Sequence, residues 1–288
     1  MVCHFWDRTE ASRTFGLGLK MGMANVPKTD SQPSGLSIFD LSGKTALITG
    51  SSQGIGLSLA TGLARAGARV VLNGRSADKL AAAAQSLGEA GADVTISAFD
   101  VTDPDAVVAA VDALEAAGHQ LDILVNNAGI QRRRTLEDFP ADTWREIMAT
   151  NLDSVFFVSQ AVARHMIRRG RGKIINISSV QAELARPGIA PYTASKGAVK
   201  NLTKGMCADW ARHGLQINAI GPGYFATPLN EGLVKDPVFD GWLKTRTPAG
   251  RWGQVEELHG AATFLASAAS DFMNGQTLYV DGGILSVL

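Results

Sequence analysis

The most chemically suggestive residues in the chain are Tyr192 and Lys196, which lie four positions apart in the segment PYTASKGAVK. On a helix, residues at this spacing share one face, with Cβ atoms about 5–6 Å apart. A tyrosine needs its pKa lowered by about 2–3 units to exchange protons at neutral pH, which corresponds to about 3–4 kcal/mol. A lysine ammonium about 5 Å away supplies about 3 kcal/mol at an effective dielectric of about 20. The pair therefore predicts acid–base chemistry at Tyr192, although the same spacing also occurs by chance on helix surfaces.

A glycine-rich segment, TGSSQGIG at residues 49–56, could bind phosphate. It follows the apolar run KTALIT, which is expected to be a strand, and it opens a helical pattern that begins at Ile55. Gly50, Gly54 and Gly56 would allow a tight turn, a close approach of the backbone to a pyrophosphate, and close packing of the helix on the sheet. This context favours dinucleotide binding over glycines that serve only a turn.

The residues Asn73-Gly74-Arg75 come after the second expected strand, where the adenosine ribose of a dinucleotide would lie. An acidic residue here usually binds the ribose hydroxyl of NAD, whereas an arginine accommodates the 2′-phosphate of NADP. The segment has no carboxylate, and Arg75 could bind a phosphate. We therefore expect NADP as the cofactor, with NAD possible; the alternative is that Arg75 is an exposed charge at the start of a helix.

Strand and helix patterns alternate along most of the chain. Strands are expected at 44–49, 69–73, 93–99, 121–125, 173–178, 216–220 and 277–280, and helices at 55–66, 77–89, 104–117, 141–168, 192–213 and 254–268. Parallel neighbours require crossover helices, so the pattern predicts an α/β fold: a single doubly wound (Rossmann) domain at 41–288 with a seven-stranded parallel sheet. Residues 1–40 lack periodicity and are expected to be a flexible extension. The irregular segment 222–252 is expected to be a substrate lid.

Composition excludes several classes of function. The chain has 27 Lys plus Arg and 27 Asp plus Glu among 288 residues, so it carries no net charge with which to attract nucleic acid or an anionic membrane. Cys3 and Cys207 are its two cysteines, with no metal-ligand spacing, which favours a reduced cytoplasmic protein without a metal site. No apolar run is long enough to span a membrane.

Other motifs occur between the glycine segment and Tyr192. They are NNAG at 126–129, Asn151 within a helix, and Ser178-Ser179 at a strand end. With TGSSQGIG and the Tyr192–Lys196 pair, they make residues 41–288 resemble the short-chain dehydrogenase/reductase family. The resemblance implies that Tyr192 is the general acid and base, Lys196 lowers its pKa and holds the nicotinamide ribose, and Ser179 binds the reacting oxygen. It also implies that Asn151 retains a water for proton relay.

The resemblance also implies a set of cofactor contacts beyond the glycine segment and Arg75. The full set is Gly50, Ser52, Gln53, Gly54, Ile55, Gly56, Arg75, Asp100, Val101, Asn127, Ala128, Gly129, Tyr192, Lys196, Pro222, Gly223 and Thr227. Most relatives of this kind are tetramers, so a homotetramer is expected.

The substrate is expected to be a small sugar acid. The segments NNAGIQRR, GPGYFAT and RTPAGRWG are similar to those of the family's sugar-acid dehydrogenases, which suggests D-gluconate and 5-keto-D-gluconate as the alcohol and ketone. A carboxylate needs a local cation in a neutral protein, and Arg132 and Arg133 are candidates. Glu183 and Arg186 could contact hydroxyl groups, beside Ser179 and Tyr192, and the alternative for Arg186 is a solvated loop charge. The alternatives are a 3-oxoacyl thioester reductase, another sugar or polyol dehydrogenase, or a protein that senses dinucleotides without catalysis.

Overall fold

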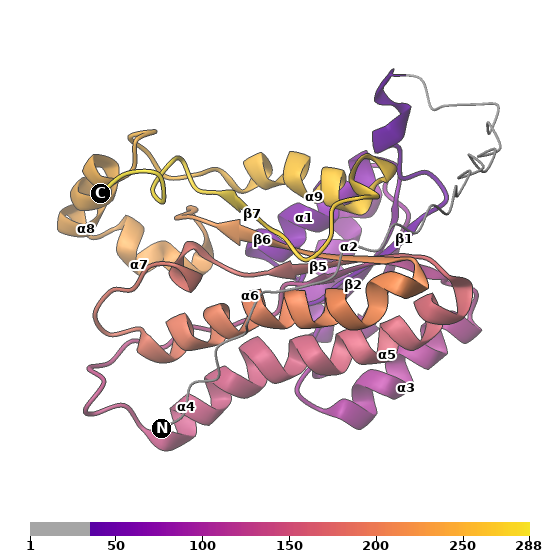
Figure 1. The fold of residues 1–288 in the computed structure, drawn as a ribbon, viewed down its shortest axis with the longest axis horizontal. Coiled ribbons are helices and arrows are strands. Elements are labelled where there is room, and N and C mark those ends of the chain that lie inside the picture. The colour runs from indigo at the N-terminus through magenta and orange to yellow at the C-terminus, as the bar shows by residue number, and fades with distance from the viewer. Residues whose placement is uncertain (1–34) are drawn as a thin grey trace, which may run out of the picture. The chain divides into compact units, whose positions relative to one another are not determined.

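A computed structural model describes residues 35–288, in which seven parallel strands form one sheet (Figure 1). The strands are β1 (Thr45–Ile48), β2 (Arg69–Gly74), β3 (Val94–Ala98), β4 (Leu121–Asn126), β5 (Gly172–Ile177), β6 (Leu215–Pro222) and β7 (Thr277–Val280). Their order across the sheet is β3-β2-β1-β4-β5-β6-β7. The order reverses between β1 and β4, and ligands of doubly wound folds bind outside the carboxyl ends of the strands at such a point. The predicted fold class is confirmed.

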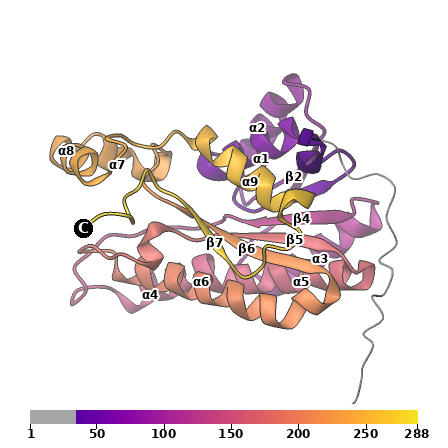
Figure 2. The ribbon, with the colours of Figure 1, turned by 45° about the horizontal axis from the view of Figure 1, so that its top comes forward.

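Helices cover both faces of this sheet (Figure 2). One layer holds α1 (Gly54–Arg65), α2 (Ala77–Glu89) and α9 (His259–Ala266), and the other holds α3 (Pro104–Ala116), α5 (Ser154–Arg169) and α6 (Ala190–Trp210). Alternate residues of each strand point to opposite layers: Ile48 packs in the first core and Leu47 in the second. Because both faces are buried, β1, β4 and β5 read in the sequence as continuous apolar runs.

Side-chain caps fix where several helices begin. Asp103 caps α3 by accepting hydrogen bonds from two backbone N–H groups of its first turn, and Pro104 follows at the first helical position. Ser76 caps α2 in the same way, through the Lys79 N–H. In contrast, α1 begins after Gln53 with no side-chain cap, so the N–H groups of its first turn are left for another partner.

The predicted helix at 141–168 is divided into α4 (Ala141–Met148) and α5 by a π-helical turn at Ala149–Asp153. A π-helical turn changes the 3.6-residue repeat only locally. The apolar pattern of the flanking helices continues on both sides of it, so the sequence predicted one uninterrupted helix. Asn151 lies on this turn and is buried.

Residues that follow β6 lie beyond the carboxyl edge of the sheet (Figure 1). They form the short helices α7 (Glu231–Val234) and α8 (Pro237–Arg246), so the segment expected to be an irregular lid is partly helical. Its role as a lid stays a prediction. Of the predicted extension at 1–40, residues 1–34 lie outside the described residues, and Gly35–Phe39 form a 3₁₀ helix. No helix within residues 35–288 is both long and apolar enough to cross a membrane.

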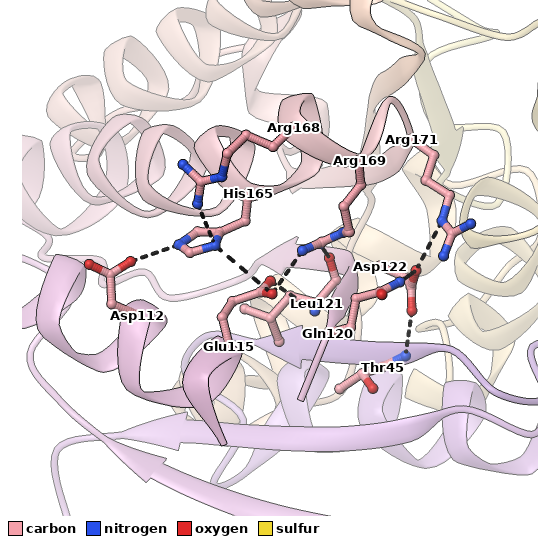
Figure 3. A network of polar contacts seen from close by, with 10 residues as sticks. All are labelled: Thr45, Asp112, Glu115, Gln120, Leu121, Asp122, His165, Arg168, Arg169 and Arg171. Carbon is pink, nitrogen blue, oxygen red and sulfur yellow. Dashed lines mark hydrogen bonds and ion pairs between the residues drawn. The ribbon is translucent and has the colours of Figure 1, made fainter. Parts of the chain in front are cut away.

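An ionic network at the opposite edge of the sheet joins α3, α5 and the start of β4 (Figure 3). Arg169 donates to Glu115 Oε2 at 2.8 Å and to the Leu121 carbonyl at 2.6 Å, and Glu115 Oε1 accepts the Leu121 N–H. Next to it, buried Asp122 accepts the Thr45 N–H at 3.2 Å, which ties β4 to β1. The Asp122 contact joins the starts of the two strands at the reversal point, where their pairing shifts register between Thr45 and Ala46.

Substituting Arg169 with Met should reduce stability without changing the site at the far edge. Removing Arg169 leaves the largely buried Glu115 carboxylate without its guanidinium partner, so we expect the free energy of unfolding to fall by about 2 kcal/mol and the Tm by about 4–8 °C. Arg65→Met, which removes an exposed arginine at the end of α1, is the matched control and should change stability by less than about 0.5 kcal/mol. Equal shifts in thermal unfolding for the two variants would show that the network contributes no more than a surface charge.

Candidate active site

A cavity of about 560 Å³ lies at the carboxyl edge of the sheet, over the reversal point between β1 and β4. Its walls come from the loops that follow β1 to β6 and from α6. All the residues expected to contact the cofactor line it: Gly50, Ser52, Gln53, Gly54, Ile55, Gly56, Arg75, Asp100, Val101, Asn127, Ala128, Gly129, Tyr192, Lys196, Pro222, Gly223 and Thr227. The structure thus brings together residues that span much of the sequence.

The glycine segment has the geometry of an anion cradle. Gly50 and Gly54 have φ values of 63° and 60°, which L-residues with side chains rarely adopt. A Cβ on Gly56 would lie 2.5 Å from the Gly50 carbonyl oxygen, so only glycine fits there. The uncapped first turn of α1 adds free N–H groups and the positive end of the helix dipole. These features fit the pyrophosphate of a dinucleotide.

Asn127 and Thr49 bind each other's backbone and so join the glycine segment to NNAG. Asn127 Nδ2 donates to the Thr49 carbonyl at 2.9 Å and to the Gly50 carbonyl at 3.0 Å. Thr49 Oγ1 accepts the Asn127 N–H at 3.0 Å and the Ala128 N–H at 3.1 Å. Asn127 was expected as a cofactor contact, whereas Thr49 had no expected role, and its position directly before the first glycine is its only signal in the sequence.

The end of the cavity farthest from Tyr192 has an exposed arginine and a hydrogen-bonded carboxylate. Arg75 is largely exposed and lies 3.8 Å from Asp100. Burial raises the pKa of Asp100, but hydrogen bonds from the Thr102 N–H and hydroxyl and the charge of Arg75 together hold that pKa below its usual value. Asn73 is buried instead. Its side chain accepts the Gly50 N–H and donates to the carbonyls of Ser97 in β3 and of Phe99 directly after that strand. Arg75 therefore remains available for an anion.

Tyr192, Lys196 and Ser179 meet in the middle of the cavity. The Lys196 ammonium lies 5.7 Å from the centre of the Tyr192 ring and donates to the Ile177 carbonyl at 2.7 Å. Burial raises the pKa of Tyr192, while a hydrogen bond with Ser179 opposes this shift. Burial lowers the pKa of Lys196 to about 8. Burial is the largest cause of both shifts, and the role expected of Lys196 in lowering the pKa of Tyr192 stays a prediction.

The two neighbouring serines have different surroundings. Ser178 donates to the Lys196 carbonyl at 3.2 Å, away from the tyrosine hydroxyl, and Ser179 is the one in contact with Tyr192. Ser179 also caps a short 3₁₀ helix, η3 (Val180–Ala182), by accepting the Gln181 N–H at 3.1 Å. The cap fixes the hydroxyl beside Tyr192.

Asn151 reaches the site through backbone contacts. Its side chain accepts the Ile130 N–H at 2.8 Å and donates to the Ile130 carbonyl at 2.9 Å and to Ser195 Oγ at 3.1 Å. Both ends of the amide are therefore engaged within the protein. Asn151 thus holds the loop after NNAG against α6, and its expected role in retaining a water stays a prediction.

The residues expected to bind substrate are dispersed. Arg132 lies outside the cavity wall and pairs with Glu146 at 2.8 Å. Glu183 also lies outside it, where its carboxylate binds the Lys200 ammonium and accepts the Tyr279 hydroxyl at 2.5 Å. Arg133 contacts Gln131 and lies near Arg186, whose charge, after burial, lowers the pKa of Arg133. The structure does not gather these three with Ser179 and Tyr192.

Other side chains occupy the wall next to Tyr192. They are Gln181 of η3, Arg186 of the loop that follows it, and Tyr224 after β6. The sequence did not indicate a shared site for Gln181 and Tyr224. They come together only because β5 and β6, which they follow, are neighbours in the sheet. No group of three or more His, Cys, Asp or Glu in residues 35–288 could hold a metal ion.

Comparisons with known proteins agree with this geometry. Residues 44–237 match the family model described as short chain dehydrogenase. The chain is 64% identical over 247 residues to gluconate 5-dehydrogenase of Gluconobacter oxydans (strain 621H). The aligned region covers 86% of this chain and 96% of that protein. It is 52% identical to 5-keto-D-gluconate 5-reductase of Escherichia coli (strain K12), over 86% of this chain and 98% of that one.

A solved structure shows the same fold. The gluconate 5-dehydrogenase from Burkholderia cenocepacia J2315, in complex with NADP and tartrate, superposes with a TM-score of 0.85 at 62% identity. The match covers 87% of this chain and 98% of that one. With its glycine cradle, its Ser179–Tyr192–Lys196 cluster and these relatives, the chain belongs to the short-chain dehydrogenase family.

Proposed function

We propose that the protein is an oxidoreductase that interconverts D-gluconate and 5-keto-D-gluconate with NADP(H). The observation that carries the proposal is a single cavity that joins an anion cradle to a buried tyrosine in contact with Ser179. The substrate follows from relatives named gluconate 5-dehydrogenase and 5-keto-D-gluconate 5-reductase, at 64% and 52% identity. The cofactor follows from Arg75 and from the NADP in the structure of the Burkholderia relative.

The cofactor would lie along the cavity from Arg75 to Tyr192. The N–H groups at the start of α1 would bind the pyrophosphate, and Arg75 would bind the 2′-phosphate. Asp100 and Val101 would contact the adenine, and Lys196 would contact the nicotinamide ribose. When bound, the nicotinamide supplies a hydride to the carbonyl carbon, or accepts it in the reverse direction.

The residues at the centre of the site handle the oxygen and its proton. Ser179 would donate a hydrogen bond to the carbonyl oxygen of the ketone, and Tyr192 would give that oxygen its proton as the carbon is reduced. The raised pKa of Tyr192 keeps the hydroxyl protonated at neutral pH, which is the form that reduction requires. Lys196, held by the Ile177 carbonyl, places a positive charge beside the phenolate that remains.

Purified protein should oxidise NADPH when 5-keto-D-gluconate is added, and Tyr192→Phe should remove most of this activity. Loss of the proton donor should lower kcat by about 10³-fold, within the range of general acid catalysis, and leave the affinity for NADPH unchanged. The measurement is absorbance of the reduced cofactor over time, with cofactor binding followed separately by fluorescence.

Three outcomes would contradict the proposal in different ways. Near-normal turnover by Tyr192→Phe would contradict the role of the tyrosine. Turnover of an acetoacetyl thioester in place of 5-keto-D-gluconate would favour a 3-oxoacyl reductase. Tight NADPH binding without turnover of any ketone would favour a sensing protein.

Arg75→Ala should weaken binding of NADPH by about 10- to 100-fold, since a charge-assisted contact to phosphate is worth about 1.5–3 kcal/mol. Binding of NADH, which has no 2′-phosphate, should change by less than about threefold. Arg69→Ala at the other end of β2 is the matched control and should affect neither cofactor. Equal losses for both cofactors after Arg75→Ala would refute the phosphate contact.

We further propose that the protein is cytoplasmic and forms a homotetramer. Several large apolar side chains remain exposed in the described residues, among them Trp144 and Phe156 on neighbouring helices and Phe272 before β7. Burying them between copies would remove apolar surface from water. Light scattering coupled to gel filtration should give four times the mass of the chain, and a monomeric mass would overturn the assembly.

A further inference from the structure

Two polar atoms on the wall of the cavity have no hydrogen-bond partner within the described residues. One is Gln181 Oε1, an acceptor, and the other is Arg186 Nε, a donor; both atoms are buried. The Gln181 side chain as a whole is only 6% exposed. An unpaired buried polar group costs about 1–3 kcal/mol, so such atoms in a binding cavity indicate a ligand with complementary groups.

Tyr224 connects these two residues to the reacting tyrosine. Gln181 Nε2 donates to the Tyr224 hydroxyl at 3.1 Å. The Oε1 atom of the same amide makes no hydrogen bond in the described residues. Arg186 hydrogen-bonds the same tyrosine. Tyr224 in turn lies close enough to Tyr192 to influence its pKa. Gln181 and Arg186 are therefore one residue away from the site of proton transfer.

The guanidinium of Arg186 is held in place without a carboxylate. Its central carbon lies 5.3 Å from the ring centre of Phe239 on α8, which supports one flat face, while the Nε–H group has no partner in the described residues. No ion pair in residues 35–288 involves Arg186 or its neighbour Arg133, although the two positive charges lie near enough to repel. Two like charges without a counter-ion favour an anion from outside.

We propose that Arg186, stacked on Phe239 and flanked by Arg133, binds the carboxylate of the substrate, and that Gln181 accepts a hydrogen bond from a neighbouring substrate hydroxyl. The proposal rests on the proposed function and names the residue that selects an acid over a neutral sugar. An unpaired donor and an unpaired acceptor match a carboxylate and a hydroxyl, the two groups that a polyhydroxy acid carries at the end of its chain remote from a C5 carbonyl. Arg132, the other candidate, is already paired with Glu146.

The test compares an acidic ketone with its neutral counterpart. For Arg186→Met, kcat/KM for 5-keto-D-gluconate should fall by about 30-fold or more, mainly through KM, because a charged hydrogen bond is lost. Activity with neutral 5-keto-D-fructose should change by less than about threefold, and Arg186→Lys should recover part of the activity with the acid. The control is Arg134→Met, an exposed arginine nearby that lies outside the cavity wall, which should behave as wild type with both ketones.

A binding measurement separates this proposal from the proposed function. Tartrate, a hydroxy diacid with no ketone to reduce, is titrated calorimetrically into the enzyme with NADP⁺. Its affinity should fall by about 10-fold or more in Arg186→Met and stay unchanged in Arg134→Met. If wild type does not reduce 5-keto-D-gluconate, the proposed function fails, and the tartrate titration alone decides on Arg186.

Two results would overturn the role of Arg186. One is an equal loss of activity with the acidic and the neutral ketone, which would indicate a structural defect. The other is equal tartrate affinity in Arg186→Met and wild type. A melting curve and NADP⁺ affinity like those of wild type confirm that each variant is folded.

Discussion

The site depends on the hydrogen bonds that Thr49 and Asn127 make across the reversal point of the sheet. They fix the glycine cradle after β1 against the NNAG loop after β4, with four contacts of 2.9–3.1 Å. From there the chain of contacts continues through Ile130 to Asn151, then to Ser195, whose hydroxyl donates to the Tyr192 carbonyl at 2.8 Å. Buried polar networks of this kind specify a single arrangement because every broken member leaves an unpaired group. The cradle and the reacting tyrosine are thus held by one continuous network.

Burial sets the charge state that this network presents. It moves the pKa of Tyr192 up and that of Lys196 down, so both groups shift toward their neutral forms. The ammonium nevertheless has only a backbone carbonyl as its hydrogen-bond partner among the described residues. An ammonium so placed can form further hydrogen bonds with ribose hydroxyls and can respond to a new charge on the tyrosine. Burial therefore favours the protonated hydroxyl of Tyr192 at neutral pH and brings the pKa of Lys196 closer to neutrality.

The fold and the residues at the centre of the cavity could be predicted from the sequence, because both depend on patterns within short segments of the chain. Parallel strands buried on both faces leave continuous apolar runs, and the glycine segment, NNAG and the Tyr192–Lys196 spacing each fall within a few residues. The π-helical turn at Asn151 was not predictable, because it changes the helix repeat without changing the apolar pattern on either side. Gln181, Arg186 and Tyr224 could not be grouped either, since they meet only where the loops after β5 and β6 converge.

The substrate residues show what spacing alone cannot decide. Arg132 and Arg133 are adjacent, yet one is neutralised by Glu146 and the other faces Arg186. Glu183 is likewise paired within the protein, because its carboxylate binds the Lys200 ammonium and accepts the Tyr279 hydroxyl. In contrast, the cations that line the cavity, Arg75, Lys196 and Arg186, form no hydrogen bond to a carboxylate in the described residues. In the proposed assignments, a neutral protein binds an anionic cofactor and an anionic substrate because Lys196 and Arg186 form no ion pair in the described residues and Arg75 has only the 3.8 Å contact with Asp100.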